Sequence, residues 1–379
     1  MRTTRRHFIQ TTVTTSVALQ TSRLGQGMAR PFPVNSGANE EEANNLISRE
    51  GKVNGLIKQD LPTPALLVDL DIFESNLQKM VGHAKSKGKN LRPHAKTHKC
   101  PQVARRLIEA GTLGICVATV REAEVMVKSG IHGVHLTSPI TDPKKVERLV
   151  KLAGQSTDVM AAVDHVYQVD LYQEAAQAQG FSVNLLVDLN VGDRRTGAEP
   201  GEMAVKVGRR ISESANLKLK GVQAYSGGSS HVNGFDARKV HSLGRMNQAT
   251  RTFQMLKDEG LPSDILSGGS TGTYNIDTEL PELTELQAGS FIFMDLDYRN
   301  IGSQNGAVYD DFGHSLTVLA TVVSANHQDQ VTVDAGLKAF ATDRDFGPEP
   351  KDIEGVSYRW GGDEFGILTL ESPRQKINL

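Results

Sequence analysis

The sequence predicts an α/β protein made of a closed, TIM-like (β/α)8 barrel followed by a β-rich C-terminal domain. From Ala65 onward, short apolar runs alternate with amphipathic segments, which is the pattern of βα units in a parallel sheet. Eight such runs match the eight strands that close a barrel. After about Asn300, strand-like runs joined by the polar turn 326–329 replace that alternation.

Each expected strand is short, and amphipathic helices lie between the strands. The eight strands are 65–68, 91–93, 114–117, 134–136, 159–163, 183–189, 221–224 and 264–266. The helices are 72–87, 101–110, 121–128, 143–153, 166–178, 201–214 and 238–259. Their apolar spacing suits packing on the outside of a barrel. In the C-terminal region, 316–323 and 330–333 are the expected strands.

The composition is that of an ordinary globular protein and excludes several classes of function. Of the 379 residues, 38% are hydrophobic and 23% are charged. Lys and Arg number 42 against 44 acidic residues, so no basic field for nucleic acid is expected. Two cysteines are too few for a disulfide framework or a zinc finger. No apolar run is long enough to span a membrane, so we expect a soluble protein with no membrane partner.

The N-terminal segment differs from the rest of the chain. Arg5 and Arg6 precede the weakly apolar stretch 8–19, which resembles a twin-arginine export signal. Gly27 and Ala29 are small residues spaced as at a cleavage site. We therefore expect export to the periplasm by the twin-arginine pathway, and a disordered basic tail is the alternative.

Four segments are expected along the chain. Residues 1–29 are the export signal, and the polar residues 30–60 form a linker. The barrel occupies 61–300, and a β-rich domain, expected to be incomplete, occupies 301–379. No internal repeat of useful length is present.

The first chemical signal is Lys96, within the run 92–99 (RPHAKTHK) that follows an expected strand. Barrel enzymes place reactive groups at that end of their strands. A lysine that forms a Schiff base must lose its proton, and cationic neighbours such as Arg92 and Lys99 favour that loss. The same spacing also fits a solvated basic loop, so Lys96 needs a second signal.

The second signal is a loop of small residues, 267–273 (SGGSTGT), after the strand 264–266. Small residues let backbone amides and hydroxyls approach an anion closely, and a helical turn expected at 274–280 would add its positive end. Barrels often hold phosphate at one of their last loops. A plain glycine-rich loop is the alternative, but together with Lys96 the pattern indicates a lysine facing a phosphate site.

Two further loops follow expected strands. The run 223–231 (QAYSGGSSH) contains Tyr225, which can contact a cofactor ring, and His231, a candidate general base. The run 188–197 (DLNVGDRRTG) contains arginines that can neutralise a phenolate or a carboxylate. A surface histidine and a surface ion pair of Arg194 with Asp193 are the alternatives.

These motifs resemble, in the same order, those of the D-threonine aldolase and eukaryotic-type D-serine dehydratase family. The matching runs are 61–69 (LPTPALLVD), 92–99, 195–197 (RTG), 225–231 and 268–273. Members of this family are pyridoxal-phosphate enzymes of the alanine-racemase type, also called fold-type III. The resemblance extends from about Asp60 to the C-terminus.

The resemblance implies a cofactor site and a reaction. Lys96 is implied to carry pyridoxal 5'-phosphate, with Arg195 near the phenolic oxygen and Tyr225 against the ring. His231 is implied to take the proton of the substrate hydroxyl. The implied enzyme is a homodimeric lyase that cleaves D-threonine, or a related D-β-hydroxy amino acid, to glycine and an aldehyde. The cofactor and its phosphate are implied to bind at Gly269, Ser270, Thr271, Gly272 and Thr273.

The resemblance also implies a divalent metal, Mn, Mg or Zn, held near the C-terminus by a histidine and an acidic or cysteine residue. No such motif is present after Asn300, where the histidines are His314 and His327, and Phe365 stands where some relatives have histidine. We therefore assign no metal ligands from the sequence.

Three other activities stay open at this stage. D-serine dehydratase chemistry would eliminate the hydroxyl group instead of breaking a carbon–carbon bond. An amino-acid racemase would need a tyrosine in the active site, for which Tyr309 and Tyr358 are the candidates. A non-catalytic pyridoxal-phosphate carrier is the third alternative: the missing metal motif favours it, and the β-rich segment after Asn300 argues against it.

Overall fold

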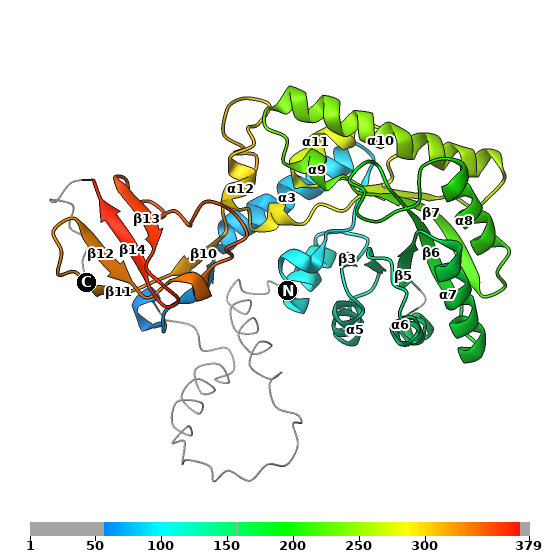
Figure 1. The fold of residues 1–379 in the computed structure, drawn as a ribbon, viewed down its shortest axis with the longest axis horizontal. Coiled ribbons are helices and arrows are strands. Elements are labelled where there is room, and N and C mark those ends of the chain that lie inside the picture. Colours follow the sequence, from blue (N-terminus) through cyan, green and yellow to red (C-terminus); the bar gives the residue numbers. More distant parts are fainter. Residues whose placement is uncertain (1–56, 157, 372–379) are drawn as a thin grey trace, which may run out of the picture. The chain divides into compact units, whose positions relative to one another are not determined.

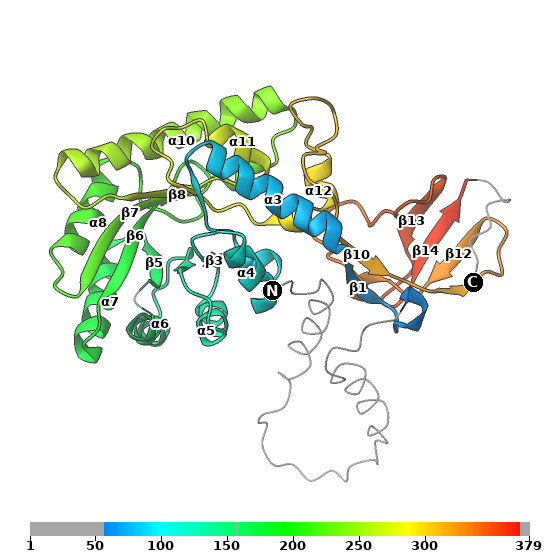
Figure 2. The same cartoon turned by 180° about the vertical axis from the view of Figure 1, so that it is seen from behind.

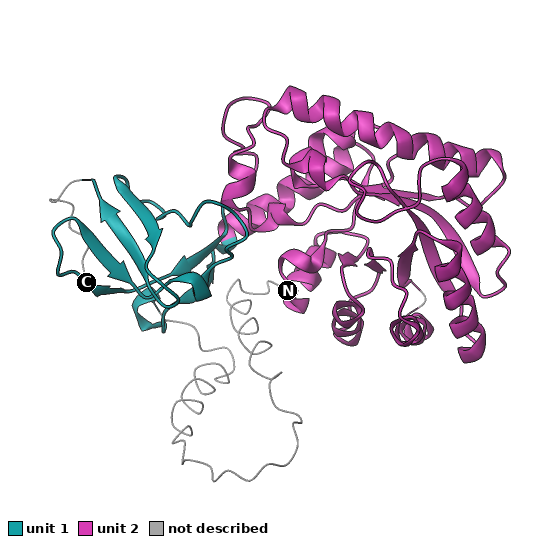
Figure 3. Ribbon diagram, in the orientation of Figure 1, with its two compact units in different colours: residues 1–70, 314–379 teal, residues 71–313 magenta. Residues whose placement is uncertain are grey.

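The structure is a computed structural model that describes residues 57–156 and 158–371 (Figure 1). The residues expected to form the export signal and nearly all of the expected linker lie outside the described residues. The chain divides into two compact units (Figure 3). One is formed by residues 71–313, and the other combines the described residues before Asp71 with those from His314 onward.

The larger unit is built on a sheet whose eight described strands are all parallel. Their order is β2-β9-β8-β7-β6-β5-β4-β3. The strands are β2 (Asn90–Leu91), β3 (Ile115–Val117), β4 (Val134–Leu136), β5 (Met160–Val163), β6 (Val183–Leu189), β7 (Leu217–Ala224), β8 (Ile265–Gly268) and β9 (Glu285–Leu286). The sheet curls until its outer strands meet, at a parallel bridge between His94 and Cys116. The Cys116 amide donates to the Pro93 carbonyl at 2.9 Å across this join. The predicted (β/α)8 fold class is confirmed.

One strand was predicted in the wrong sheet. Residues 65–68 form a strand, β1 (Ala65–Val68), but it pairs antiparallel with β10 (Leu316–Leu319) in a separate two-stranded sheet. The eighth barrel strand is β9, which the sequence analysis did not predict. This strand has only two residues and begins with Glu285, so it contains no apolar run that would predict a strand. The glutamate can lie inside the barrel because it forms an ion pair with Arg92.

Helices cover the outside of the curled sheet, as Figures 1 and 2 show. The longer ones are α3 (Leu70–Ser86), α4 (Pro101–Glu109), α5 (Val120–Lys128), α6 (Pro143–Gln155), α7 (Val166–Gln179), α8 (Glu202–Ser212) and α10 (Phe235–Asp258). Local sequence sets their ends. Asp142 caps α6 by accepting from the Lys144 amide at 2.9 Å, with Pro143 in the first turn. Gly180 ends α7 in the left-handed conformation, with φ of 71°.

The smaller unit contains a four-stranded antiparallel sheet in the order β11-β12-β14-β13. Its strands are β11 (Val322–Ser324), β12 (Gln330–Val333), β13 (Val356–Trp360) and β14 (Gly366–Leu370). Val331, Val333 and Leu368 form its small core. The alternation of buried and exposed residues along β14 is the pattern of a sheet with one covered face. No helix among the described residues is both long and apolar enough to cross a bilayer.

Candidate active site

A cavity of about 350 Å³ opens at the C-terminal ends of the barrel strands. The loops after β2, β3, β4, β6, β7, β8 and β9 all contribute to its wall. This is the end of the barrel where enzymes of this architecture place their reactive groups. Its volume lies in the range of small-molecule sites.

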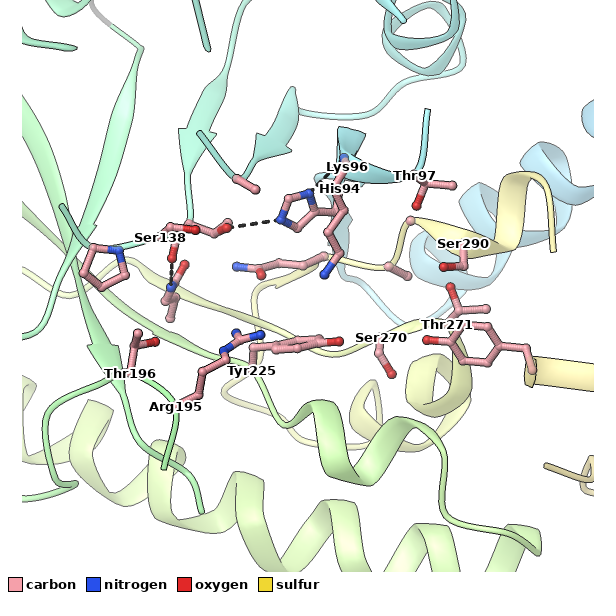
Figure 4. Close-up of a pocket in the computed structure, with 18 residues that line it drawn as sticks. His94, Lys96, Thr97, Ser138, Arg195, Thr196, Tyr225, Ser270, Thr271 and Ser290 are labelled. Carbon is pink, nitrogen blue, oxygen red and sulfur yellow. Dashed lines mark hydrogen bonds between the residues drawn. The ribbon is translucent and has the colours of Figure 1, made fainter. Parts of the chain in front are cut away.

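Lys96 and Arg195 approach the same aromatic ring in this cavity. Lys96 Nζ lies 5.1 Å from the centre of the Tyr225 ring, and the guanidinium carbon of Arg195 lies 5.3 Å from it. Figure 4 shows the three side chains converging from different loops. Lys96 belongs to a short 3-10 helix, Ala95–Thr97, and its amide donates to His94 Nδ1 at 3.2 Å. The local backbone therefore directs this lysine into the barrel mouth.

The cationic residues expected to surround Lys96 interact with other groups or are neutral. Arg92 forms a buried ion pair with Glu285, with Nε 2.9 Å from Oε1. Lys99 is exposed, and its Nζ lies 4.0 Å from a Glu122 oxygen. Burial lowers the pKa of His98 to about 4, so that ring is neutral near pH 7. The cation that shares the cavity with Lys96 is instead Arg195.

The loop after β8 has the form of an anion cradle. Gly269 adopts φ of +76°, and Ser270 and Thr271 line the cavity. Ser270 and Thr273 are tied by their hydroxyls at 3.0 Å, and the Thr273 hydroxyl donates to Asp277 at 2.5 Å. The helix that follows, α11 (Tyr274–Asp277), has only four residues, so its dipole adds little at this loop.

Gly272 lets the cradle pack against the next loop. A Cβ on Gly272 would lie 2.1 Å from the carbonyl oxygen of Ser230, which belongs to the short helix α9 (Gly227–Ser230). The two loops that the sequence singled out, 267–273 and 223–231, are therefore in backbone contact. Only glycine permits that approach.

Asp193 fixes the start of the loop that bears Tyr225. Its carboxylate accepts from the Gly227 amide at 2.5 Å and from the Gly228 amide at 3.3 Å. The Asp193 carboxylate thereby holds the 223–231 loop. Arg195 and Tyr225 are thus kept at a defined separation.

His231 lies beside the cavity wall rather than in it. Its ring packs on Tyr298, with centroids 4.5 Å apart, and Tyr298 lines the cavity. Its Nδ1 lies 3.2 Å from Asp297 Oδ2. Both partners belong to α12 (Leu296–Arg299), where Asp295 caps the helix by accepting from the Tyr298 amide at 2.8 Å.

A buried polar network forms the floor of the cavity. Gln223 donates to Asp188 at 2.8 Å, and Thr196 donates to the second oxygen of the same carboxylate at 2.8 Å. Burial raises the pKa of Asp188 to about 6, against the two hydrogen bonds that lower it. His135 lies 2.8 Å from the Gln223 side-chain oxygen. This network holds Thr196 and the adjacent Arg195 at the end of β6.

The chain is similar to proteins with two related activities. Models of the alanine racemase N-terminal domain and of the serine dehydratase domain match residues 68–297 and 315–379. The 3-hydroxy-D-aspartate aldolase of Paracoccus denitrificans (strain Pd 1222) is 33% identical over 328 residues, 86% of this chain and 84% of that protein. The D-threonine aldolase of Arthrobacter sp is 34% identical over 322 residues, 84% of this chain and 82% of that protein. The crystal structure of D-threonine aldolase from Filomicrobium marinum, 38% identical, has a TM-score of 0.78 and covers 83% of each chain.

The chain belongs to the D-threonine aldolase and D-serine dehydratase family. The family predicted from the five sequence motifs is confirmed, as is its alanine-racemase-type fold. The site described above lies within the matched region 68–297.

Several residues that line the cavity were not predicted from the sequence. They include Tyr298, Gln287 and Ser290, which follow β9. Barrel enzymes place reactive groups in the loops that follow their strands, which is why Lys96 was predicted. If β9 had been predicted as a strand, the loop after it would have been a candidate for the active site by the same rule. Thr137 and Ser138, after β4, were open to the same rule.

Each of the two tyrosines considered for racemase chemistry donates a hydrogen bond to a backbone carbonyl. Tyr309 is buried, and its hydroxyl donates to the Thr271 carbonyl at 2.5 Å. Tyr358 lies in the smaller unit and donates to the Ala335 carbonyl at 2.8 Å. Within residues 57–156 and 158–371, three or more potential His, Cys, Asp or Glu ligands do not gather at any one place.

Proposed function

We propose that this protein is a pyridoxal-phosphate-dependent lyase that cleaves a D-β-hydroxy amino acid to glycine and an aldehyde. The observation that carries the proposal is the convergence of Lys96 Nζ and the Arg195 guanidinium on the Tyr225 ring, at the mouth of a barrel of this family. Family membership supports both the cofactor and the class of substrate.

The residues present fit the cofactor at each of its reactive ends. The cavity offers a primary amine, Lys96, for the aldehyde, and a guanidinium, Arg195, for the phenolic oxygen. The glycine-containing cradle offers hydroxyls and amides for the phosphate, at a position where a Cβ on Gly272 would clash with backbone. We propose that Tyr225 contacts the ring of the cofactor.

The side chains then divide the work of the reaction. When bound, the cofactor supplies a conjugated ring that accepts the electron pair released as the Cα–Cβ bond of the substrate breaks. Arg195 balances negative charge beside that ring. We propose that Tyr298 contacts the substrate and that His231, packed behind it, accepts the proton of the β-hydroxyl. The Asp297 carboxylate beside His231 Nδ1 stabilises the charge that the imidazole gains.

No step is assigned to a metal. Residues 57–156 and 158–371 contain no group of three or more His, Cys, Asp or Glu side chains placed to hold a metal ion. Metal dependence is therefore left to the assay.

The test combines a spectrum with product analysis. Protein purified with the cofactor should show a visible absorbance band that disappears in Lys96→Ala. It should remain in Lys99→Ala, because Lys99 is exposed beside Glu122. Incubations with D-threonine are run both with and without added Mn, Mg or Zn, and acetaldehyde and glycine should form in at least one of these conditions. Formation of a 2-oxo acid and ammonia from D-serine would indicate a dehydratase. A visible absorbance band that does not shift when any amino acid is added would indicate a carrier.

Two further proposals concern the protein in the cell. We propose a homodimer, which sedimentation of the purified protein tests directly. We also propose export by the twin-arginine pathway, on the pattern around Arg5 and Arg6. Replacing both arginines by lysine should retain a fused reporter in the cytoplasm; an unchanged distribution would refute the export proposal.

A further inference from the structure

Arg238 is a fully buried arginine in the first turn of α10, outside the set of residues that line the cavity. Its guanidinium donates four hydrogen bonds, all to backbone carbonyls. Nε donates to Gly272 at 2.8 Å and Nη2 to Gly302 at 2.8 Å. Nη1 donates to Val232 at 2.9 Å and to Ile301 at 3.0 Å. One side chain thus joins the cradle, the loop after His231 and the segment after α12.

In the described part of the chain, Arg238 donates no hydrogen bond to a carboxylate; burial lowers the pKa of its guanidinium, although the charge of Asp311 lies near enough to raise it. All of its hydrogen bonds there end on neutral carbonyls. Burying an ionised group is costly, and carbonyl dipoles together with a carboxylate that does not touch the guanidinium offset only part of that cost. A bound anion nearby would offset more. The cradle, one hydrogen bond away through Gly272, is where such an anion would bind.

Arg238 also fixes the direction of the cradle's peptide groups. A trans peptide is planar, with its C=O and N–H pointing in opposite directions. Arg238 holds the Gly272 carbonyl, and Tyr309 holds the Thr271 carbonyl at 2.5 Å. These two side chains are neighbours, with the guanidinium carbon 5.7 Å from the Tyr309 ring centre. The amide N–H of Gly272 therefore points away from this buried side, as does that of Thr273, which donates to the Ser270 carbonyl at 3.3 Å.

We propose that Arg238 is a positioning residue for the phosphate of the cofactor. It orients the cradle amides together with Tyr309, and its buried positive charge favours a dianion over a neutral ligand. This inference rests on the proposed function only in taking the anion to be the phosphate of pyridoxal phosphate. The hydrogen bond to Val232 also ties the residue after His231 to the cradle, so phosphate binding and the position of His231 are coupled.

The test compares a phosphorylated with an unphosphorylated ligand. Cofactor-free protein is titrated with pyridoxal phosphate, with pyridoxal and with inorganic phosphate, and affinity is read from absorbance and thermal stabilisation. In Arg238→Gln, affinity for pyridoxal phosphate should fall roughly 10- to 100-fold, the size expected when hydrogen bonds from a charged group are lost. Affinity for pyridoxal should change less than about threefold. Arg238→Lys should lie between wild type and Arg238→Gln.

Two controls separate positioning from folding. Arg251→Gln removes an exposed arginine from the same helix and should change neither affinity. Tyr309→Phe keeps the ring but releases the Thr271 carbonyl, and it too should weaken pyridoxal phosphate more than pyridoxal. If Arg238→Gln does not fold, Arg238→Lys and Tyr309→Phe decide the question.

The outcomes distinguish this inference from the proposed function. If wild-type protein binds pyridoxal phosphate but the variants lose affinity for both ligands by the same factor, Arg238 serves only the fold and the inference is wrong. If wild-type protein binds no pyridoxal phosphate at all, the proposed function fails as well.

Discussion

Replacing Glu285 by glutamine should destabilise the barrel strongly. Glu285 is 1% exposed and Arg92 is 5% exposed, and two hydrogen bonds of 2.9 and 3.0 Å join them between β9 and β2. Glutamine keeps the shape but leaves the buried guanidinium without a counter-charge. Breaking one side of a buried ion pair typically costs about 3–5 kcal/mol. For a unit of this size, that loss lowers the melting temperature by roughly 6–20 °C.

Urea unfolding of wild type and Glu285→Gln, followed by circular dichroism, measures the loss. The double variant Arg92→Met with Glu285→Leu replaces both charges by apolar groups and should recover most of the stability, because neither charge is then buried alone. A loss below about 1 kcal/mol in Glu285→Gln would show that water or another group compensates Arg92, and would refute the reasoning.

The same pair has a defined pH dependence. Burial raises the pKa of Glu285, but the Arg92 charge and the hydrogen bonds from Arg92 and Ser267 outweigh it, so the pKa lies below its ordinary value. A carboxyl whose pKa is lower in the folded state stabilises the protein above its unfolded pKa and loses that contribution as the pH falls through the folded one. The difference between wild type and Glu285→Gln should therefore be constant from pH 6 to 8 and shrink only at acidic pH, on the order of pH 4 and below.

Three other outcomes follow from the site. Gly272→Ala should weaken pyridoxal phosphate binding by roughly 5- to 100-fold, since its Cβ would meet a carbonyl, whereas Gly244→Ala, with open space on α10, should leave binding unchanged. His135 is fully buried and His98 is partly buried, and the pKa of each is lowered to about 4. The protein should therefore lose stability as the pH falls from about 6.5 to 4, by roughly 3 kcal/mol for His135. The variant His135→Asn should lose less stability over this pH range, as measured by denaturant titration. Asp193→Asn should lower kcat/KM about tenfold with little change in melting temperature, because it weakens the hydrogen bonds from two amides of an exposed loop. An unchanged kcat/KM would show that other contacts hold the loop.

The reactive loops could be predicted because barrel geometry and residue chemistry coincide in them. Lys96, Tyr225 and Ser270 each follow an apolar strand, and the strand ends bring them to one cavity. Tyr298 could not be found in this way, because it follows β9, a strand with only two residues. The position of His231 beside the wall was also beyond the sequence, since it depends on how α12 packs.

Other features depend on contacts between distant segments. Residues 65–68 are apolar whether they join a parallel barrel or pair antiparallel with β10, so periodicity could not choose between the two. The role of Arg238 could not be predicted from the sequence for a related reason. Its partners are carbonyls of three other segments, and a carbonyl is present at every position of a chain.

The pairing of β1 with β10 has a consequence for synthesis on the ribosome. β1 ends at Val68 and β10 begins at Leu316, so the chain of the whole barrel is made between them. The backbone hydrogen-bonding groups of β1 consequently remain without their partner strand while the barrel emerges and folds. During that interval the nascent chain exposes an apolar strand edge, the kind of surface that favours aggregation and that chaperones bind. Slower translation after residue 313 would prolong this exposure.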